Sequence, residues 1–195
     1  MPVNSQNLTL ADITRLIQDQ PPAAKPSAGL RPAAVLVPLV KEQGGWSLLF
    51  TRRAETLANH KGQVSFPGGA VDPQDSSLED TALREAQEEI GLHPGDVHIF
   101  GRLDSLHTVS NFLITPVLGQ ICWPYHFRLS PSEVSRVFTI PLDWLADPRS
   151  REERPRVLPD GRVENIIYFQ PYDGEILWGA SARITVDLLK VLRLI

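Results

Sequence analysis

A run of apolar residues at helical spacing, within the segment LREAQEEIGL, constrains the fold of this chain more than any other feature. Leu83, Ala86 and Ile90 recur at intervals that place them on one face of a helix. Gly91 follows directly and suits the left-handed backbone of a helix C-cap. We therefore expect a helix over residues 78–90 that packs this apolar face inward.

Three glutamates stand on a different face of the same helix. Glu85, Glu88 and Glu89 lie at positions i, i+3 and i+4, where like charges repel by roughly a few tenths of a kcal/mol per pair. We expect all three to point outward, either as a solvated surface or as a site for a doubly charged cation. The sequence FPGG at residues 66–69 favours the cation site, because glycines let a backbone carbonyl approach the helix. Mg²⁺ takes carboxylate and carbonyl oxygens of this kind as ligands.

The net charge limits the partners that the protein can bind. The formal net charge is -4 and the pI is about 5.7. An acidic chain has no general attraction for nucleic acid or for an anionic membrane. If the ligand is a polyanion, cations must mediate the contact.

The cysteine content and the hydropathy of the chain suggest its compartment. Cys122 is the single cysteine, which excludes an intrachain disulfide and a thiolate zinc cluster, and we expect it to be a small buried residue. The N-terminus lacks a basic region followed by an apolar run, and no apolar stretch reaches the roughly eighteen residues of a membrane helix. We expect a soluble protein of the reduced cytoplasm.

The remaining segments alternate between helix and strand patterns. Thr9 followed by Asp12 predicts the start of a short helix, and the four prolines of residues 21–32 indicate an extended linker. Strand patterns occupy residues 33–40, 46–53, 96–106, 111–121 and 134–140, the first two joined as a hairpin at Gly44-Gly45.

The C-terminal third contains a loop, a hairpin and a helix. Residues 146–162 are polar and broken by proline, which indicates a loop. Residues 165–179 suggest a hairpin that turns at Asp173-Gly174, and residues 180–195 close the chain as an amphipathic helix. Interleaved helices and strands predict an α/β or α+β fold with a mixed β-sheet between helices.

The acidic helix and the loop before it resemble a known motif. GGAVDPQDSSLEDTALREAQEEIGL is similar to the Nudix box, and six residues occupy the places expected at its end: Arg84, Glu85, Glu88, Glu89, Gly91 and Leu92. The front of the box departs from the pattern, because Asp75 stands at the usual glutamate and one extra residue separates it from Arg84.

The segment before the box resembles one branch of this family, the coenzyme A pyrophosphatases. LLFTRRAETLANHKGQVSFPGG matches the pattern of that branch at several positions: Arg52, Leu57, His60, Gly62, Val64 and FPGG.

The resemblance implies a fold, a metal and a reaction. The fold would be an α/β/α sandwich with a central mixed β-sheet over residues 33–195, preceded by an N-terminal helix and proline-rich arm over residues 1–32. The substrate would be coenzyme A or a derivative, opened by water to 3′,5′-ADP and 4′-phosphopantetheine. Bound Mg²⁺ or Mn²⁺ would be held by four groups: Glu85, Glu88, Glu89 and the backbone carbonyl of Gly69. Arg84 would be structural and hold the loop through Asp75 or a neighbour.

Other roles stay open at this point. Glu85 and Glu133 are both candidates for the general base, although Ser130 and Glu133 also have the spacing of a purely structural capping box. Four basic residues before the box are candidates for binding phosphate or are ordinary exposed side chains: Arg52, Arg53, His60 and Lys61.

Three alternatives to a coenzyme A diphosphatase stay open as well. The first is a Nudix hydrolase for another substrate, such as ADP-ribose or a dinucleoside polyphosphate. The second is a non-catalytic Nudix-fold module that binds nucleotides, although such modules typically lose box carboxylates. The third is an acidic solubilising helix on an unrelated fold. The oligomeric state cannot be derived from the sequence.

Overall fold

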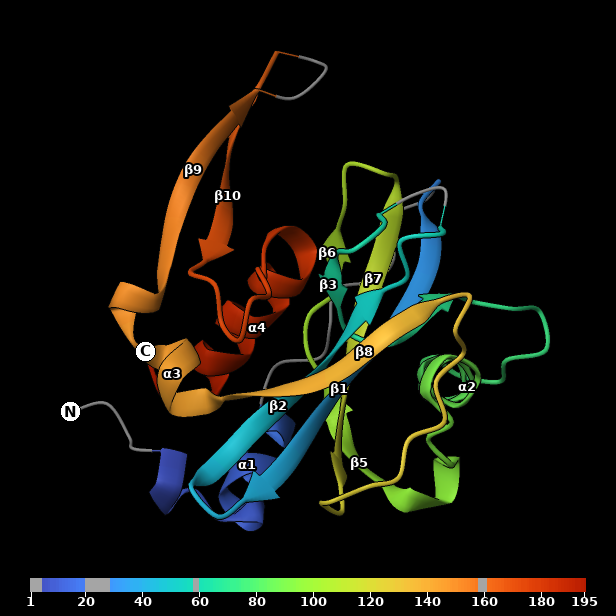
Figure 1. Cartoon of the computed structure of the whole chain (residues 1–195), viewed down its shortest axis with the longest axis vertical. Helices are drawn as coiled ribbons and strands as arrows, with labels where there is room; N and C mark the ends of the chain where they lie inside the picture. Colours follow the sequence, from blue (N-terminus) through green and yellow to red (C-terminus); the bar gives the residue numbers. More distant parts are fainter. Residues whose placement is uncertain (1–4, 20–28, 58–59, 158–160) are drawn as a thin grey trace.

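The computed structural model describes residues 5–19, 29–57, 60–157 and 161–195 (Figure 1). Its helices are α1 (Leu10–Gln18), α2 (Leu78–Ile90), α3 (Leu142–Ala146) and α4 (Gly179–Val191), with short 3₁₀ turns at Ser5–Asn7, Pro94–Asp96 and Pro148–Ser150. Its strands are β1 (Arg31–Glu42), β2 (Gly45–Arg53), β3 (Val64–Ser65), β4 (Gly68–Ala70), β5 (Val97–Arg102), β6 (Leu106–His107), β7 (Phe112–Ile121), β8 (Val134–Pro141), β9 (Arg151–Val157) and β10 (Val163–Phe169). No helix within the described ranges is long and apolar enough to cross a membrane.

A mixed sheet of eight strands forms the centre of the described structure. The main path runs β3-β2-β1-β7-β5, while β8 pairs with β2, β4 with β1 and β6 with β7. The predicted hairpin of β1 and β2 is present, with Leu39 opposite Leu48. β1 runs parallel to β7, with Ala34 opposite Thr115, so the sheet is mixed as predicted.

Helices cover both faces of this sheet (Figure 1). α2 packs on one face, in a core cluster that includes Leu36 and Leu49. α1, α3 and α4 contribute to the cluster on the other face, which includes Leu39 and Phe50. Successive side chains of a strand point to opposite faces, so neighbouring residues of β2 enter different cores. The predicted α/β/α sandwich is confirmed.

The N-terminal helix packs against the body of the domain. Thr9 and Asp12 form the predicted capping box, and Ile13 and Ile17 are buried in the core cluster that α4 also joins. β1 begins at Arg31, two residues before the expected start. The expected linker lies mostly outside the described residues, and the division of the chain after residue 32 stays a prediction.

The expected loop over residues 146–162 is wrong in its middle part. β9 lies there and pairs antiparallel with β10, and the two strands project from the body as a separate sheet (Figure 1). β9 is charged, contains Pro155 and is exposed on both faces. It therefore lacks the alternation of apolar and polar residues by which a strand is recognised in a sequence.

The second expected hairpin is present at its turn and again near its ends, where Tyr168 pairs with Trp178. Asp173 and Gly174 both have positive φ angles, and Tyr172 and Glu175 exchange backbone hydrogen bonds across them. All of β10, however, pairs with β9, and its last residue, Phe169, also donates a backbone hydrogen bond to the carbonyl of Leu177 after the turn.

Two other details also differ from the sequence-based predictions. Cys122 is exposed, because it follows the buried Ile121 at the end of β7 and points away from the core. β3 and β4 lie in the region interpreted as loop, since strands of two or three residues are too short to show a pattern.

Candidate active site

Local sequence signals position the acidic helix. α2 begins and ends as predicted: Ser77 caps its first turn by accepting from the backbone N–H of Asp80, and Gly91 ends it with φ 67°. A Cβ at Gly91 would lie 2.8 Å from the Cβ of Arg128. Both the left-handed backbone and this close neighbour therefore require glycine.

The three box glutamates differ sharply in exposure. The side chain of Glu88 is 56% exposed and that of Glu85 is 17% exposed, while Glu89 is only 3% exposed. The expectation that all three point outward is therefore wrong for Glu89. Glu89 lies near the interface between α2 and the sheet, where Ala86 and Ile90 are also buried.

Burial changes the protonation of Glu89. Desolvation, together with the charges of Glu85 and Glu133, raises the pKa of its carboxyl group to about 8, although the charge of Arg53 opposes the rise. The backbone N–H of Gly68 donates a hydrogen bond to this carboxylate. Gly68 is thus a site residue that the sequence did not single out, although it lies within the FPGG motif.

Glu85 lies directly against the FPGG segment. A Cβ on Gly69 would be 2.5 Å from the carboxyl carbon of Glu85, so any larger residue here would displace the Glu85 carboxylate. Partial burial raises the pKa of Glu85, the ion pair with Arg84 opposes the rise, and the charges of Glu88 and Glu133 add to it. The structure therefore places Gly69 beside Glu85, as the metal-ligand set implied by the resemblance requires.

Glu133 comes to the acidic cluster from a distant part of the chain. Its backbone carbonyl accepts from Ala54 N–H at the end of β2, and Ser130 N–H donates to the carbonyl of Glu89. The expected capping box is wrong, because residues 131–133 form a turn into β8 and no helix starts there. The charge of Glu133 reaches Glu85 and Glu89 instead, which keeps it a candidate base.

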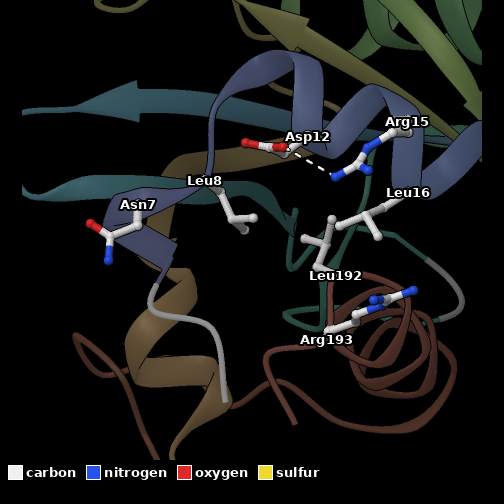
Figure 2. Close-up of a pocket in the computed structure, with 7 residues that line it drawn as sticks. All are labelled: Asn7, Leu8, Asp12, Arg15, Leu16, Leu192 and Arg193. Carbon is white, nitrogen blue, oxygen red and sulfur yellow. Dashed lines mark hydrogen bonds and ion pairs between the residues drawn. The ribbon is translucent and has the colours of Figure 1, made fainter. Parts of the chain in front are cut away.

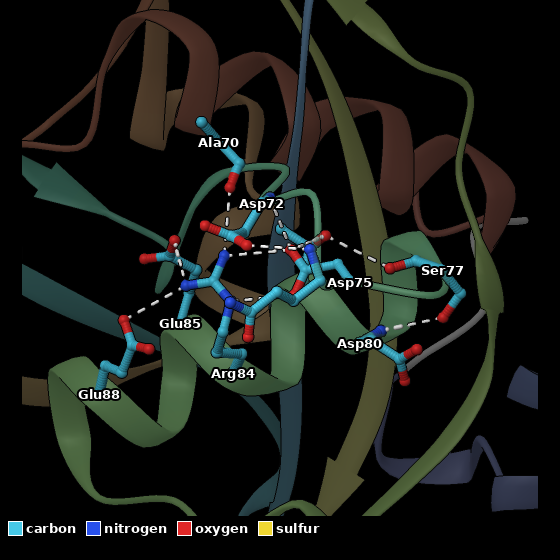
Figure 3. Close-up of polar contacts among 10 residues, drawn as sticks. Ala70, Asp72, Asp75, Ser77, Asp80, Arg84, Glu85 and Glu88 are labelled. Carbon is cyan, nitrogen blue, oxygen red and sulfur yellow. Dashed lines mark hydrogen bonds and ion pairs between the residues drawn. The ribbon is translucent and has the colours of Figure 1, made fainter.

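Arg84 connects the helix to the loop before it (Figure 3). Its Nε and Nη2 donate to the two carboxylate oxygens of Asp75 at 3.0 and 3.1 Å, and Nη2 also donates to the carbonyl of Ala70 at 3.2 Å. Nη1 donates to Glu85 at 2.9 Å and to Glu88 at 3.2 Å. Arg84 holds the pKa of Asp75 well below its usual range. The predicted pairing of Arg84 with Asp75 is thus present.

Comparisons with known proteins decide the family. The NUDIX domain family matches residues 30–171. The chain belongs to the Nudix family. It is 39% identical over 184 residues to an uncharacterized Nudix hydrolase, NudL, of Pectobacterium atrosepticum, and the match covers 90% of both chains.

Solved structures agree with the Nudix fold. The Nudix hydrolase RenU of M. smegmatis superposes with a TM-score of 0.51 at 23% identity, covering 60% of this chain and 74% of RenU. A MutT/nudix family protein of Enterococcus faecalis gives a TM-score of 0.51 at 14% identity, covering 96% of this chain and 76% of that protein. At these identities the likeness shows the fold alone.

The acidic cluster of the Nudix box fits a divalent cation in charge and in chemistry. The charges of Glu85 and Glu133 act on the largely buried carboxylate of Glu89. Carboxylates are the ligands that Mg²⁺ and Mn²⁺ prefer. Among the described side chains, however, no group of three or more is already arranged to hold a metal. Arg84 contacts one carboxylate oxygen of Glu85 and one of Glu88, so the second oxygen of each is not engaged by its guanidinium.

The basic residues before the Nudix box separate into different environments. Arg52 and Arg53 are neighbours on β2, so their side chains point to opposite faces of the sheet. Arg52 lies on the α4 side, with its Nε 3.6 Å from Glu175, whereas Arg53 lies on the α2 side near Glu89. The two arginines are therefore not a single phosphate-binding pair.

The two residues of the turn after β2 are less closely connected to the box. His60 adopts a left-handed φ of 56°, is exposed, and its Nδ1 lies 2.9 Å from the side-chain oxygen of Gln63. Lys61 is also exposed. Their predicted contact with phosphate stays a prediction.

A small cleft lies elsewhere on the molecule, between α1 and the end of the chain (Figure 2). Its volume is about 250 Å³, and its lining is formed by Asn7, Leu8, Asp12, Arg15, Leu16, Leu192 and Arg193. None of these residues belongs to the Nudix box, so this cleft is not part of the candidate active site.

The bidentate pair of Arg84 and Asp75 leads to a stability prediction. Asp75→Asn removes one charged acceptor from a side chain that is only 4% exposed, and we expect it to lower the free energy of unfolding by about 1–3 kcal/mol at pH 7. Urea denaturation measures this change. Asp80→Asn is the matched control, since it makes the same substitution at an exposed position of α2 and should change stability by less than about 1 kcal/mol. Equal losses in the two variants would mean that Asp75 does not anchor the loop.

Proposed function

We propose that this Nudix protein hydrolyses the diphosphate bond of coenzyme A or its derivatives, with Mg²⁺ or Mn²⁺ bound at the acidic cluster. The products would be 3′,5′-ADP and 4′-phosphopantetheine. One observation carries the proposal: the segment that resembles the coenzyme A branch folds onto the box itself. Its final glycines touch Glu85 and Glu89, and Arg53 within it lies near Glu89.

The box glutamates and the Gly69 carbonyl would bind the cations. When bound, these cations polarise the diphosphate and lower the pKa of a coordinated water. Gly68 N–H orients the Glu89 carboxylate, and the pairing of Arg84 with Asp75 fixes the loop that carries Gly69. The protein's contribution is therefore to fix the orientation of carboxylates that would otherwise repel one another.

A carboxylate near the cluster must accept the proton of the attacking water. The water oxygen forms a bond to one phosphorus while the bond from that phosphorus to the bridging oxygen breaks, and the bridging oxygen leaves on the other phosphate. Glu85 and Glu133 are the two candidate bases, since both lie within electrostatic reach of Glu89. Glu85→Gln and Glu133→Gln separate them: the variant that lacks the base should lose the acidic limb of the pH profile of kcat.

Product analysis tests the reaction. Purified protein is incubated with coenzyme A, and separately with ADP-ribose, in Mg²⁺ or Mn²⁺, and the products are separated by chromatography. We expect 3′,5′-ADP from coenzyme A, and its loss in Glu89→Gln. Cleavage of ADP-ribose alone would keep the Nudix chemistry and reject the coenzyme A assignment. If neither compound were cleaved, a nucleotide-binding module would become the better explanation.

A further inference from the structure

Two arginines face each other at the end of the ladder between β2 and β8. Arg52 of β2 stands directly opposite Arg136 of β8, and the two form the last regular pair before the register shifts at Arg53. Like charges in directly opposed positions of an antiparallel pair destabilise a sheet. Each of the two side chains is 38% exposed, so water screens the repulsion only in part. A negative group is therefore expected between them.

Glu175 supplies that negative group from the turn before α4. Its Oε1 accepts a hydrogen bond from Arg136 at 3.3 Å, and its Oε2 lies 3.6 Å from Nε of Arg52. Glu175 is only 9% exposed. The turn is itself held against β8, because Arg136 also donates to the backbone carbonyl of Asp173 at 3.2 Å and to its carboxylate. One nearly buried carboxylate thus bridges the ends of two strands.

The segments just beyond this pair of arginines determine where Glu133 lies. Ala54, two residues after Arg52, donates its backbone N–H to the carbonyl of Glu133 at 2.8 Å. The turn that contains Glu133 is fixed at its other end, where Ser130 N–H donates to the carbonyl of Glu89 at 2.9 Å. The position of Glu133 relative to Glu89 therefore depends on how β2 and β8 are held together at their ends.

We propose that Glu175 is a positioning residue: it keeps β2 and β8 closed at the two arginines and so holds Glu133 beside the box glutamates. The inference rests on the proposed function, because it gives Glu133 a part in the hydrolysis. Glu175 acts through the arginines, since its contact with Arg52 lies on the α4 side of the sheet and the box lies on the α2 side. Without its charge, Arg52 and Arg136 repel each other, and the hydrogen bond from Ala54 to Glu133 opens more often.

Amide hydrogen exchange, measured by NMR without substrate, tests the contact between the strand ends. In Glu175→Gln we expect the amide of Ala54 to exchange about five to ten times faster, while the amide of Leu49, in the middle of β2, keeps its rate. Arg136→Gln removes one of the two opposed charges. The double variant Glu175→Gln/Arg136→Gln should therefore exchange at Ala54 close to the rate of the unmodified protein. Glu153→Gln, the same change at an exposed position of β9, is the control.

Steady-state kinetics supply a readout that a merely structural role would not move. We expect the kcat of Glu175→Gln to fall about tenfold with little change in KM, because a displaced Glu133 acts on the reaction and not on substrate binding. The double variant with Arg136→Gln should recover this loss. In a Glu133→Gln background, Glu175→Gln should cause no further loss, since a residue that acts through another has no effect once the other is removed.

The pattern across these variants decides the proposal. Faster exchange at both Ala54 and Leu49 would indicate a general loss of stability and would overturn it. Unchanged exchange at Ala54, an unchanged kcat, or a further loss in the Glu133→Gln background would overturn it as well. Failure of the proposed function is seen separately in the product analysis, because hydrogen exchange shows whether Glu175 positions Glu133 even if neither compound is cleaved.

Discussion

Glu89→Gln is expected to lower turnover strongly and, at the same time, to stabilise the metal-free protein at pH 8. The folded protein holds the proton of Glu89 more tightly than the unfolded chain, because the pKa is raised from 4.5 to about 8. The stability of the metal-free protein should therefore fall as the pH rises from about 4.5 to about 8. Glutamine stays neutral and avoids this loss, so its advantage should grow over that range to a few kcal/mol, on the order that such a shift implies.

Urea denaturation in a chelator, at several pH values from 5 to 8, measures this advantage. Glu88→Gln is the control, since it removes the same charge from a side chain that is more than half exposed. The activity of Glu89→Gln should fall by about a thousandfold, since losing a metal ligand removes several kcal/mol of transition-state stabilisation. An advantage of Glu89→Gln that stays constant with pH would contradict the raised pKa assigned to this buried residue.

The two glycines of FPGG are expected to respond in opposite ways to alanine. A Cβ at Gly69 would meet the carboxyl group of Glu85 at 2.5 Å, and that flexible side chain can move aside. A Cβ at Gly68 would lie 2.4 Å from the backbone carbonyl oxygen of Ala34, which cannot move without disturbing β1. Gly69→Ala should therefore keep the fold and displace a metal ligand, whereas Gly68→Ala should mainly destabilise the protein.

Thermal or urea unfolding and a Mn²⁺ titration distinguish these effects. We expect Gly68→Ala to lose about 3 kcal/mol or more of folding free energy. Gly69→Ala should stay within about 1 kcal/mol of the unmodified protein but bind Mn²⁺ about tenfold more weakly. Unaltered Mn²⁺ affinity in a folded Gly69→Ala protein would show that the position of Glu85 does not depend on Gly69.

Local patterns in the sequence were enough to predict α2, the β1–β2 hairpin and the start of α1. The helix begins after Ser77 and ends at Gly91 because capping and the left-handed backbone are decided by adjacent residues. The β1–β2 hairpin and the capping box of α1 follow from signals of equally short range. β9 was missed, since an exposed two-stranded sheet needs no apolar face and leaves no periodic signal.

The environment of each site residue depends on contacts between distant parts of the chain. The spacing of Glu85, Glu88 and Glu89 placed them on one helix face, but the packing of α2 on the sheet made one of them buried and another exposed. Glu133 joins them only because its loop returns to the end of α2 after more than forty residues of sequence, counted from Glu89. No local pattern contains that information.

The sequence by itself determined the family, the acidic cluster and the helix that carries it, because a helix aligns residues three and four positions apart whatever surrounds it. Only the tertiary structure decided that Glu89 is the desolvated carboxylate. It also decided that the charges of Arg53 and Glu133 act on Glu89. Those properties depend on desolvation and on distances through space, and both are set by how the helix and the sheet pack together.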